Sequence, residues 1–337
     1  MPRQARIDAP GALHHIIIRG IEKRSIFRDD QDRDNFLERL GRILSETSTP
    51  CYAWALMHNH IHLLLRTGRA PIATVMRRLL TGYAQQFNRR HNRHGQLFQN
   101  RYKSILCEED PFLLELVRYI HLNPVRAEIV KELKQLNSYH YCGHAVLMGT
   151  TKHAWHHKDY VLKYFGRAEG QARKEYASFV AGGLRMGRQP NLVGGGLLRS
   201  VGGWSSLKAH RRQGTRIKGD ERILGSGDFV EKVLERANEE LEQRTRFQVS
   251  GLSFDTLVSS VADYYGLKAD KLITASKEPI VVKARSTLCY IAVRKLMLSG
   301  KQVALKLNIS PSAVSKAIRR GESILLETEI EKVLGES

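Results

Sequence analysis

The sequence lacks the features that mark secreted, disulfide-stabilised and membrane-spanning proteins. Its four cysteines are scattered without a CxxC pair, which argues against a disulfide framework and against a zinc ribbon. No apolar run reaches the ~18 residues of a transmembrane helix, and the first residues, MPRQARIDAPGALHH, lack the apolar core of a signal peptide. These absences predict a cytoplasmic protein that does not span a membrane.

Acidic residues are also scarce. The 337 residues include 34 Asp and Glu against 54 Lys and Arg, which gives a net charge of +20. A surplus of this size favours a polyanionic partner, and nucleic acid is the usual one. An anionic membrane is the rival partner, but the sequence has no amphipathic basic helix with an aromatic face to support it.

The first 150 residues alternate between strand-like and helix-like patterns. Apolar runs predict strands at 12–20, 51–57, 61–67 and 96–107, and helical spacing predicts helices at 29–47, 72–91 and 110–122. The order βαββαβ followed by a helix predicts an α+β fold, a ferredoxin-like antiparallel sheet with helices on one face. We expect residues 1–150 to form one domain.

Residues 151–250 have no clear overall pattern. The glycine-rich stretch VGGGLLRSVGGW (193–204) lacks the GK[ST] ending of a phosphate-binding loop, so it predicts a flexible connection and not a nucleotide site. The segment SGDFVEKVLERANEELEQR (226–244) predicts a charged amphipathic helix. We interpret 151–250 as a connecting region that is partly helical.

Residues 251–330 predict an all-α domain. QVALKLNI and SPSAVSKAIRRGESIL form a helix, a turn around Asn308–Ser310, and a second helix that is capped by Ser310 and begins with Pro311. Between Lys283 and Gly321 there are nine Lys and Arg and no acidic residue. A solvated helix face usually mixes both signs, so this helix-turn-helix is better explained by contacts to phosphates.

Three histidines fall within MHNHIHLLL (57–65). Residues two apart in a strand point to the same face, so the imidazoles of His60 and His62 should aim at one point. Two such imidazoles form half of a divalent metal site. The alternative, a packed pair of core histidines, is equally open, and His58 sits where two strands join.

A second group of polar side chains occurs in VRYIHLNPVRA (117–127). Tyr119 and Asn123 are four residues apart and should project from one helix face. A tyrosine can act as a nucleophile and form a covalent intermediate, and the amide oxygen of Asn123 could bind a metal. The alternative for Tyr119 is an amphipathic residue at the edge of the core.

These motifs together resemble a known family. HIH on a strand, FQNRYKS (98–104) and RYIHLNPVRA (118–127) resemble the IS200-like tyrosine transposases, and more closely the REP-associated tyrosine transposases, which are HUH single-stranded DNA endonucleases. The resemblance covers roughly residues 7–148. Residues 255–325 resemble the helix-turn-helix domain of the bacterial initiator DnaA, through KARSTLCYIAVRKL and SPSAVSKAIRRG. The family often has proline in place of His58, so His58 is not the ligand that its motif supplies.

The resemblance implies a mechanism and a location on the bacterial nucleoid. His60 and His62 would bind Mg²⁺ or Mn²⁺, with Asn123 as the third protein ligand, and Tyr119 would attack single-stranded or hairpin DNA to form a 5′-phosphotyrosine bond. The free 3′-hydroxyl of a second strand could then reverse the step and join the strands. The residues expected to contact DNA are Arg101, Lys103 and Arg118 in the first domain and Arg285, Ser312, Ser315, Lys316 and Arg319 in the last. Apart from the resemblance, the basic helix at 72–91 offers Arg77, Arg78, Arg89 and Arg90 as further candidates for phosphate contacts, and a solvated helix face explains them equally well.

Several alternatives remain open at this point. The protein could be a catalytically inactive DNA-binding regulator derived from a transposase, or a metal-dependent nuclease that uses water in place of Tyr119. It could act as a monomer or as a homodimer that shares active sites. The DNA sequence that it recognises does not follow from the motifs.

Overall fold

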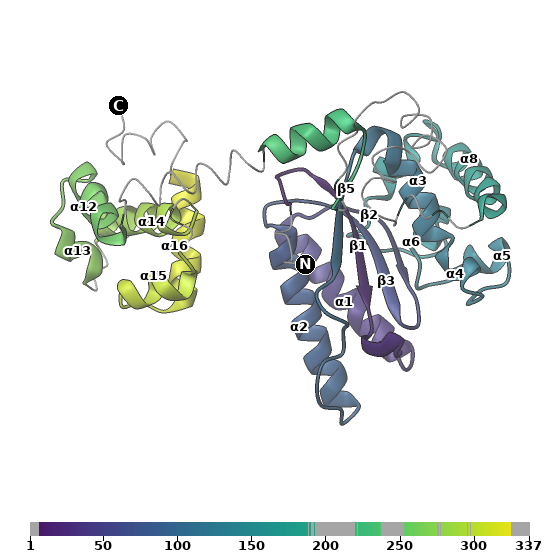
Figure 1. Ribbon diagram of the computed structural model, residues 1–337, viewed down its shortest axis with the longest axis horizontal. Coiled ribbons are helices and arrows are strands. Elements are labelled where there is room, and N and C mark those ends of the chain that lie inside the picture. Colours follow the sequence, from purple (N-terminus) through teal and green to yellow (C-terminus); the bar gives the residue numbers. More distant parts are fainter. Residues whose placement is uncertain are drawn as a thin grey trace. The chain divides into compact units, whose positions relative to one another are not determined.

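A five-stranded sheet is the centre of the first part of the chain (Figure 1). The strands lie in the order β2-β3-β1-β4-β5; the pairs from β2 to β4 are antiparallel, whereas β5 is parallel to β4. The bounds are β1 (Leu13–Arg19), β2 (Cys51–Leu56), β3 (His60–Arg66), β4 (Lys103–Cys107) and β5 (Ile223–Leu224). The first four strands have the ferredoxin-like order that the sequence predicts, and β5 extends one edge.

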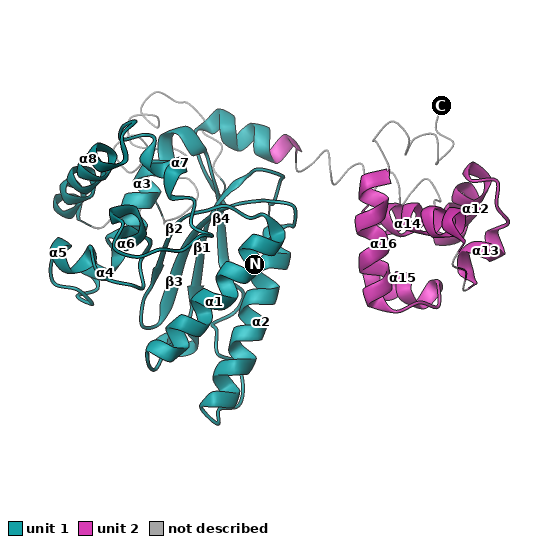
Figure 2. Cartoon of the chain, turned by 180° about the vertical axis from the view of Figure 1, so that it is seen from behind, with its two compact units in different colours: residues 1–233 teal, residues 234–337 magenta. Residues whose placement is uncertain are grey.

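The structure is a computed structural model that describes residues 7–187, 189, 192, 220, 222–236, 253–274, 276, 278–294, 296 and 298–324. It has two compact units, residues 1–233 and 234–337, which Figure 2 shows in different colours. The glycine-rich stretch 193–204 and much of the segment 188–252 lie outside the described residues. The three-domain division with boundaries at 150 and 250 stays a prediction.

Helices cover both faces of the sheet. α1 (Asp30–Thr47) and α2 (Ile72–Arg90) share a buried core with Ile16 of β1 on one face. α3 (Glu109–His121) shares a separate core with Ile17 on the other face. The predicted layer of helices corresponds to α1 and α2. α3 adds a second layer because the strands are apolar on both sides, and both sides have to be buried.

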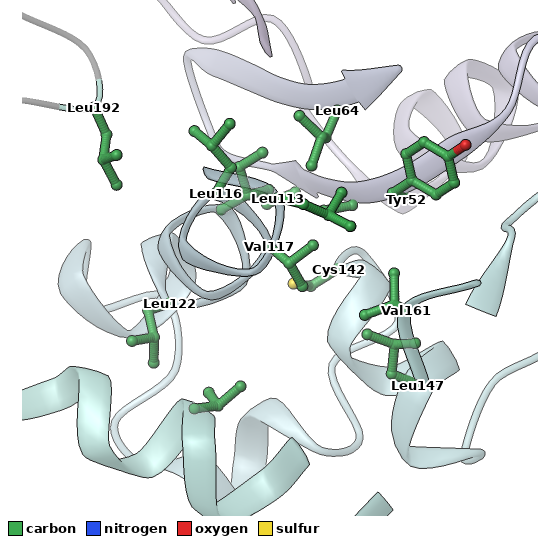
Figure 3. Close-up of a cluster of buried hydrophobic side chains, with 14 of the residues drawn as sticks. Tyr52, Leu64, Leu113, Leu116, Val117, Leu122, Cys142, Leu147, Val161 and Leu192 are labelled. Atoms are coloured by element: carbon green, nitrogen blue, oxygen red, sulfur yellow. The ribbon is translucent and has the colours of Figure 1, made fainter. Parts of the chain in front are cut away.

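The remaining helices of the first unit, apart from a short turn after β1, follow α3 in the chain. They include the 3-10 turn η1 (Ile21–Lys23), α4 (Asn123–Arg126), α5 (Leu133–Leu136), α6 (Gly143–Met148), α7 (Lys158–Leu162), α8 (Glu169–Gly182) and the 3-10 turn η2 (Gly183–Met186). A further helix begins at residue 227, within the predicted helix 226–244. Figure 3 shows Leu113 and Leu116 of α3 in one apolar cluster with Leu64 of β3, Leu147 of α6 and Val161 of α7. α3 therefore lies between the sheet and these later helices.

The fourth strand is shorter than the sequence predicts. A strand was expected over 96–107, but β4 begins only at Lys103. Phe98 forms an isolated bridge with Gly20, and Asn100 then has a φ of 56°, in the left-handed region that interrupts a strand. Arg101 therefore lies outside β4, whereas Lys103 begins it, and the prediction of one strand that includes both residues is wrong.

The second unit is built from helices in the part that the structure describes. They are α12 (Phe254–Tyr264), α13 (Ala269–Ile273), α14 (Pro279–Arg294), α15 (Gly300–Lys306) and α16 (Pro311–Ile324). α15, a turn with Asn308 at a φ of 49°, and α16 occupy the positions of the predicted helix-turn-helix, and the Ser310 hydroxyl accepts a hydrogen bond from the Ala313 amide at 3.2 Å. Among the described helices of both units, none has the length and apolar character to cross a membrane.

Candidate active site

His60 and His62 lie on the face of the sheet that α3 covers. Both are on β3, two residues apart, and their ring centroids are 5.2 Å from each other. His62 is 4% exposed and pairs across the sheet with Ile17, whereas His60 is half-buried at the start of the strand. The alternation of side chains along a strand therefore produces the pair that the sequence predicts.

Burial keeps both imidazoles neutral. Burial, with a smaller contribution from Arg19, lowers the pKa of His60 to about 4. Burial and the neighbouring cations and imidazoles hold the pKa of His62 well below its usual value. Nδ1 of His60 lies 2.7 Å from Oδ1 of Asn59, and because an amide oxygen only accepts, Nδ1 carries the proton. Nε2 of His60 thus has a free lone pair for a metal ion.

His15 completes this group, and the sequence analysis missed it. Its Nε2 lies 2.9 Å from Nδ1 of His62, and the two rings stack with centroids 5.2 Å apart. If His62 donates this hydrogen bond, its own Nε2 keeps a lone pair, which is how outer imidazoles orient metal ligands. The sequence did contain a signal for His15. Leu13, His15 and Ile17 are each two residues apart in the first strand, so His15 lies on the same face as Leu13 and Ile17, which is the face that α3 covers.

Tyr119 lies against the same imidazoles, on α3 of the same chain. Its ring centroid is 5.8 Å from that of His62 and 6.0 Å from that of His15. It also packs against the apolar core, so the core-edge interpretation and the site interpretation both describe its position. Burial raises the pKa of Tyr119, and the positive charges of Arg126 and Arg19 act in the opposite direction.

Arg126 is a second residue that the sequence analysis missed. Its guanidinium carbon lies 5.5 Å from the centroid of the Tyr119 ring. It follows Tyr119 by seven residues, a spacing of two helical turns, but α3 ends at His121 and α4 begins at Asn123, so continuous helical spacing would not have been a safe guide. Arg126 brings a cation next to the candidate nucleophile.

Asn123 begins α4, directly beyond the end of α3. Its amide nitrogen donates to the backbone oxygens of Tyr119, at 3.1 Å, and Ile120, at 3.4 Å. These bonds leave the amide oxygen as the available acceptor. Asn123 is thus fixed beside Tyr119, but no contact joins it to His60 or His62 in the part of the chain that the structure describes.

The donor set fits a divalent ion. Two neutral imidazoles on one rigid strand can each offer a lone pair, and the Asn123 oxygen is fixed one helical turn from Tyr119. Imidazole suits Mn²⁺ better than Mg²⁺, which prefers oxygen. Among the described residues, no three His, Cys, Asp or Glu side chains are arranged to hold a metal, so an ion here would need oxygen ligands from Asn123, water or substrate.

The basic residues expected to contact DNA differ in their surroundings. Arg101 and Lys103 are exposed. The Arg118 side chain is only 11% exposed because its guanidinium pairs with Glu115 at 2.5 Å and stacks on Phe179, with its central carbon 4.3 Å from the ring centroid. Arg118 would have to leave both partners to reach a phosphate.

In the second unit, the residues that are predicted to contact DNA also include both exposed side chains and one that is engaged with other parts of the protein. Arg285 donates to backbone oxygens at the end of α13 and just beyond it, including Leu272 at 2.9 Å and Lys271 at 3.2 Å. These bonds identify it as a residue that connects α14 to α13. The residues of α16 that the sequence predicts to contact DNA, Ser312, Ser315, Lys316 and Arg319, are all exposed.

α1 and α2 enclose an arginine-lined groove of about 420 Å³, on the sheet face opposite Tyr119. Arg39, Arg42 and Arg77 line it without an acidic partner among the described ion pairs, whereas Arg78 pairs with Glu46. Arg90, also expected to bind phosphate, pairs with Asp29 and Asp32.

A tyrosine beside a pair of strand-borne histidines, on a ferredoxin-like sheet, is the arrangement that the sequence motifs predict for a tyrosine transposase domain. Residues 10–123 match the sequence profile of the family described as "Transposase IS200 like". This part of the chain is therefore similar to the IS200-like transposases, which supports a transposase function for the first unit.

Two solved structures are also similar to the chain. One is a REP-associated tyrosine transposase bound to a REP hairpin, with 17% identity, a TM-score of 0.37, and coverage of 46% of this chain and 91% of that one. The other is a putative transposase from Deinococcus radiodurans, with 16% identity, a TM-score of 0.26, and coverage of 40% and 98%. No protein with a curated description matches the chain. The similarity to this family rests on the profile match over residues 10–123.

Proposed function

We propose that the first unit cleaves and rejoins single-stranded or hairpin DNA through a covalent 5′-phosphotyrosine bond on Tyr119. One observation carries this proposal: the ring of Tyr119 lies 5.8 Å from that of His62, within one chain, and His62 lies 5.2 Å from His60. A nucleophile and a pair of metal-binding imidazoles are the two parts that such a reaction needs.

The reaction exchanges one phosphodiester bond for another. Oη of Tyr119 attacks the phosphorus and loses its proton, the bond from phosphorus to the 3′-oxygen breaks, and that oxygen leaves as a hydroxyl after it takes up a proton. Attack by a second 3′-hydroxyl reverses the step and joins two strands without ATP. His60, His62 and the Asn123 oxygen would hold Mn²⁺ or Mg²⁺, which supplies charge neutralisation at the scissile phosphate when bound.

The tyrosine needs help to lose its proton. Burial raises the pKa of Tyr119, so the phenol is protonated at neutral pH. The guanidinium of Arg126 beside the ring favours the phenolate and would also attract the phosphate. Arg126 is therefore the residue of this chain that we assign to activation of Tyr119.

The second unit would bind duplex DNA. Ser312, Ser315 and Lys316 are exposed on α16, the second helix of the helix-turn-helix, which is the helix that enters the major groove in such motifs. The chain's net charge of +20 supports a DNA partner. In this proposal the second unit holds the protein near its site while the first unit acts on an unpaired segment.

A covalent adduct is the direct test. The full chain, with Mn²⁺ or Mg²⁺, is incubated with labelled single-stranded hairpin DNA taken from repeats that flank its gene, and SDS-resistant adducts are resolved on a gel. An adduct from the parent and none from Tyr119→Phe supports the proposal. Cleavage without adduct by both chains would indicate a nuclease that uses water. Binding without cleavage, with both metals and several repeats, would indicate an inactive regulator.

A further inference from the structure

A buried chain of hydrogen bonds holds the end of α3 on the side away from the sheet. Nδ1 of His121 lies 2.7 Å from Oη of Tyr176 on α8, and this hydroxyl lies 2.8 Å from Nδ1 of His144 on α6. Nε2 of His144 in turn lies 2.8 Å from Oδ1 of Asn137. His121 and Tyr176 are fully buried, and His144 is 1% exposed.

The direction of every bond in this chain follows from its last member. An amide oxygen only accepts, so Nε2 of His144 donates to Asn137 and Nδ1 of this neutral ring must accept. The Tyr176 hydroxyl therefore donates to His144, and its oxygen accepts from Nδ1 of His121. Among the described residues, the Tyr176 hydroxyl is the group that bonds Nδ1 of both imidazoles, whereas Nε2 of His121 is buried without a partner.

Close packing supports the same end of α3. A side chain on Gly143 of α6 would place its Cβ 2.7 Å from Nε2 of His121, and one on Gly183 would place it 2.8 Å from Leu122. Arg118 lies over Phe179 of α8, and Arg126 donates to the backbone oxygen of Gly183 at 3.4 Å. Residues from α6, α8 and η2 thus surround the last turn of α3.

We propose that residues 137–183, which we call the clamp, fix α3 so that Tyr119 stays against His62 of its own chain. Tyr119 and His121 project from nearly opposite sides of α3, because residues two apart in a helix differ by ~200°. The clamp holds one side of the helix, and the other side presents the nucleophile. His121 and Tyr176 are positioning residues, and this role rests on the function proposed above.

Tyr176→Phe tests the clamp, and Tyr83→Phe is its matched control. Tyr83 is also buried, and its hydroxyl donates to the Ile26 backbone oxygen at 2.6 Å in the core on the opposite sheet face. Both changes remove one buried hydroxyl, so similar losses of thermal stability are expected. Only Tyr176→Phe should slow adduct formation, about tenfold at saturating hairpin DNA, with an unchanged Kd for that DNA measured in EDTA.

Hydrogen exchange of the full chain gives a readout that does not need activity. Tyr176→Phe should speed amide exchange at residues 117–122, and Tyr83→Phe should not. The clamp is wrong if exchange there is the same in both variants, or if both lower the adduct rate equally. It is also wrong if a mixture of Tyr119→Phe and His62→Ala chains forms adduct, because the tyrosine would then act on the metal site of another chain.

Two changes at His121 keep the test informative if Tyr176→Phe does not fold. His121→Asn keeps a donor near the position of Nδ1 and should retain most of the parent rate, whereas His121→Leu keeps the volume and should lose it. Equal rates for the two variants would overturn the clamp. If the parent chain forms no adduct but Tyr176→Phe still speeds amide exchange at residues 117–122, the proposed function is wrong. The clamp would then remain a structural feature that fixes α3.

Discussion

At the scale of single residues, His15 is expected to tune the metal site without binding the ion. For His62 to offer Nε2, its Nδ1 must carry the proton and donate to Nε2 of His15, 2.9 Å away. His15→Leu removes this acceptor and should weaken Mn²⁺ binding about 10- to 100-fold. His15→Gln keeps an acceptor and should bind nearly as the parent does. Titration of the unliganded chain with Mn²⁺, followed by EPR, measures both, and equal affinities for the two variants would contradict this role.

Arg126 should set the pH at which Tyr119 reacts. Its positive charge favours the phenolate, so Arg126→Met should raise the pKa of Tyr119 further. The rate of adduct formation should fall about tenfold at neutral pH and recover as the pH rises. Arg118→Met is the control, because the Arg118 guanidinium faces Glu115 and Phe179. The pH–rate profiles of the two variants decide the point, and a profile for Arg126→Met that matches the control would remove Arg126 from the mechanism.

Spacing predicted the members of the site that share a periodic element. His60 and His62 follow from the period of two in a strand, and Tyr119 follows from its position on an amphipathic helix. His15 and Arg126 did not follow, because each reaches the site through tertiary structure: β1 pairs with β3 in one register among several, and a break between α3 and α4 redirects Arg126. The surroundings of Arg118 and Arg285 were equally invisible, because their partners lie on other helices.

At the scale of elements, local patterns again predicted the periodic features and missed those that depend on tertiary structure. The apolar runs predicted the first four strands and the helices between them, within a few residues except at β4. That strand starts late because Asn100 takes a left-handed conformation, which no apolar pattern reports. β5 is two residues long and pairs with β4 from more than a hundred positions away, so no local pattern could indicate it. The second helical layer, formed by α3, was not predicted, because it depends on which faces of the strands have to be buried.

The cap of α16 is an element-scale feature that can be tested directly. The Ser310 hydroxyl accepts from the amide of Ala313, so Ser310→Ala should destabilise the second unit by about 1 kcal/mol. Ser315→Ala is the matched control: its hydroxyl donates to the Pro311 backbone oxygen within the helix and caps nothing, so a change within about 0.5 kcal/mol is expected. Urea unfolding followed by circular dichroism compares the two; equal midpoints would show that the cap does not stabilise this unit.

At the scale of the whole molecule, the histidines divide the chain. All fourteen lie before residue 234, so the second unit has none, and the three tryptophans lie in the first unit as well. Burial lowers the pKa of His144 to about 4 and that of His156 to about 3. His156 accepts from the Trp54 indole at 3.2 Å and lies 3.0 Å from the Tyr52 backbone oxygen, which places a buried neutral imidazole beside a fluorescent reporter.

This division predicts that mild acid destabilises only the first unit. In the unfolded chain these histidines regain a pKa near ~6.5, so below that pH the unfolded state binds more protons than the folded state. The stability that these neutral histidines contribute to the first unit is complete above pH ~6.5 and is lost as the pH falls toward about 4. At pH 5 the loss is on the order of 1–2 kcal/mol for each group. The denaturant midpoint from tryptophan fluorescence should therefore fall between pH 7 and pH 5, above the range in which carboxyl groups titrate. The circular-dichroism transition of the second unit should stay in place.

His156→Gln, which can keep both hydrogen bonds, should make the fluorescence midpoint less dependent on pH. If both units shift together, or if His156→Gln keeps the parent's slope, the buried histidines do not carry the pH dependence.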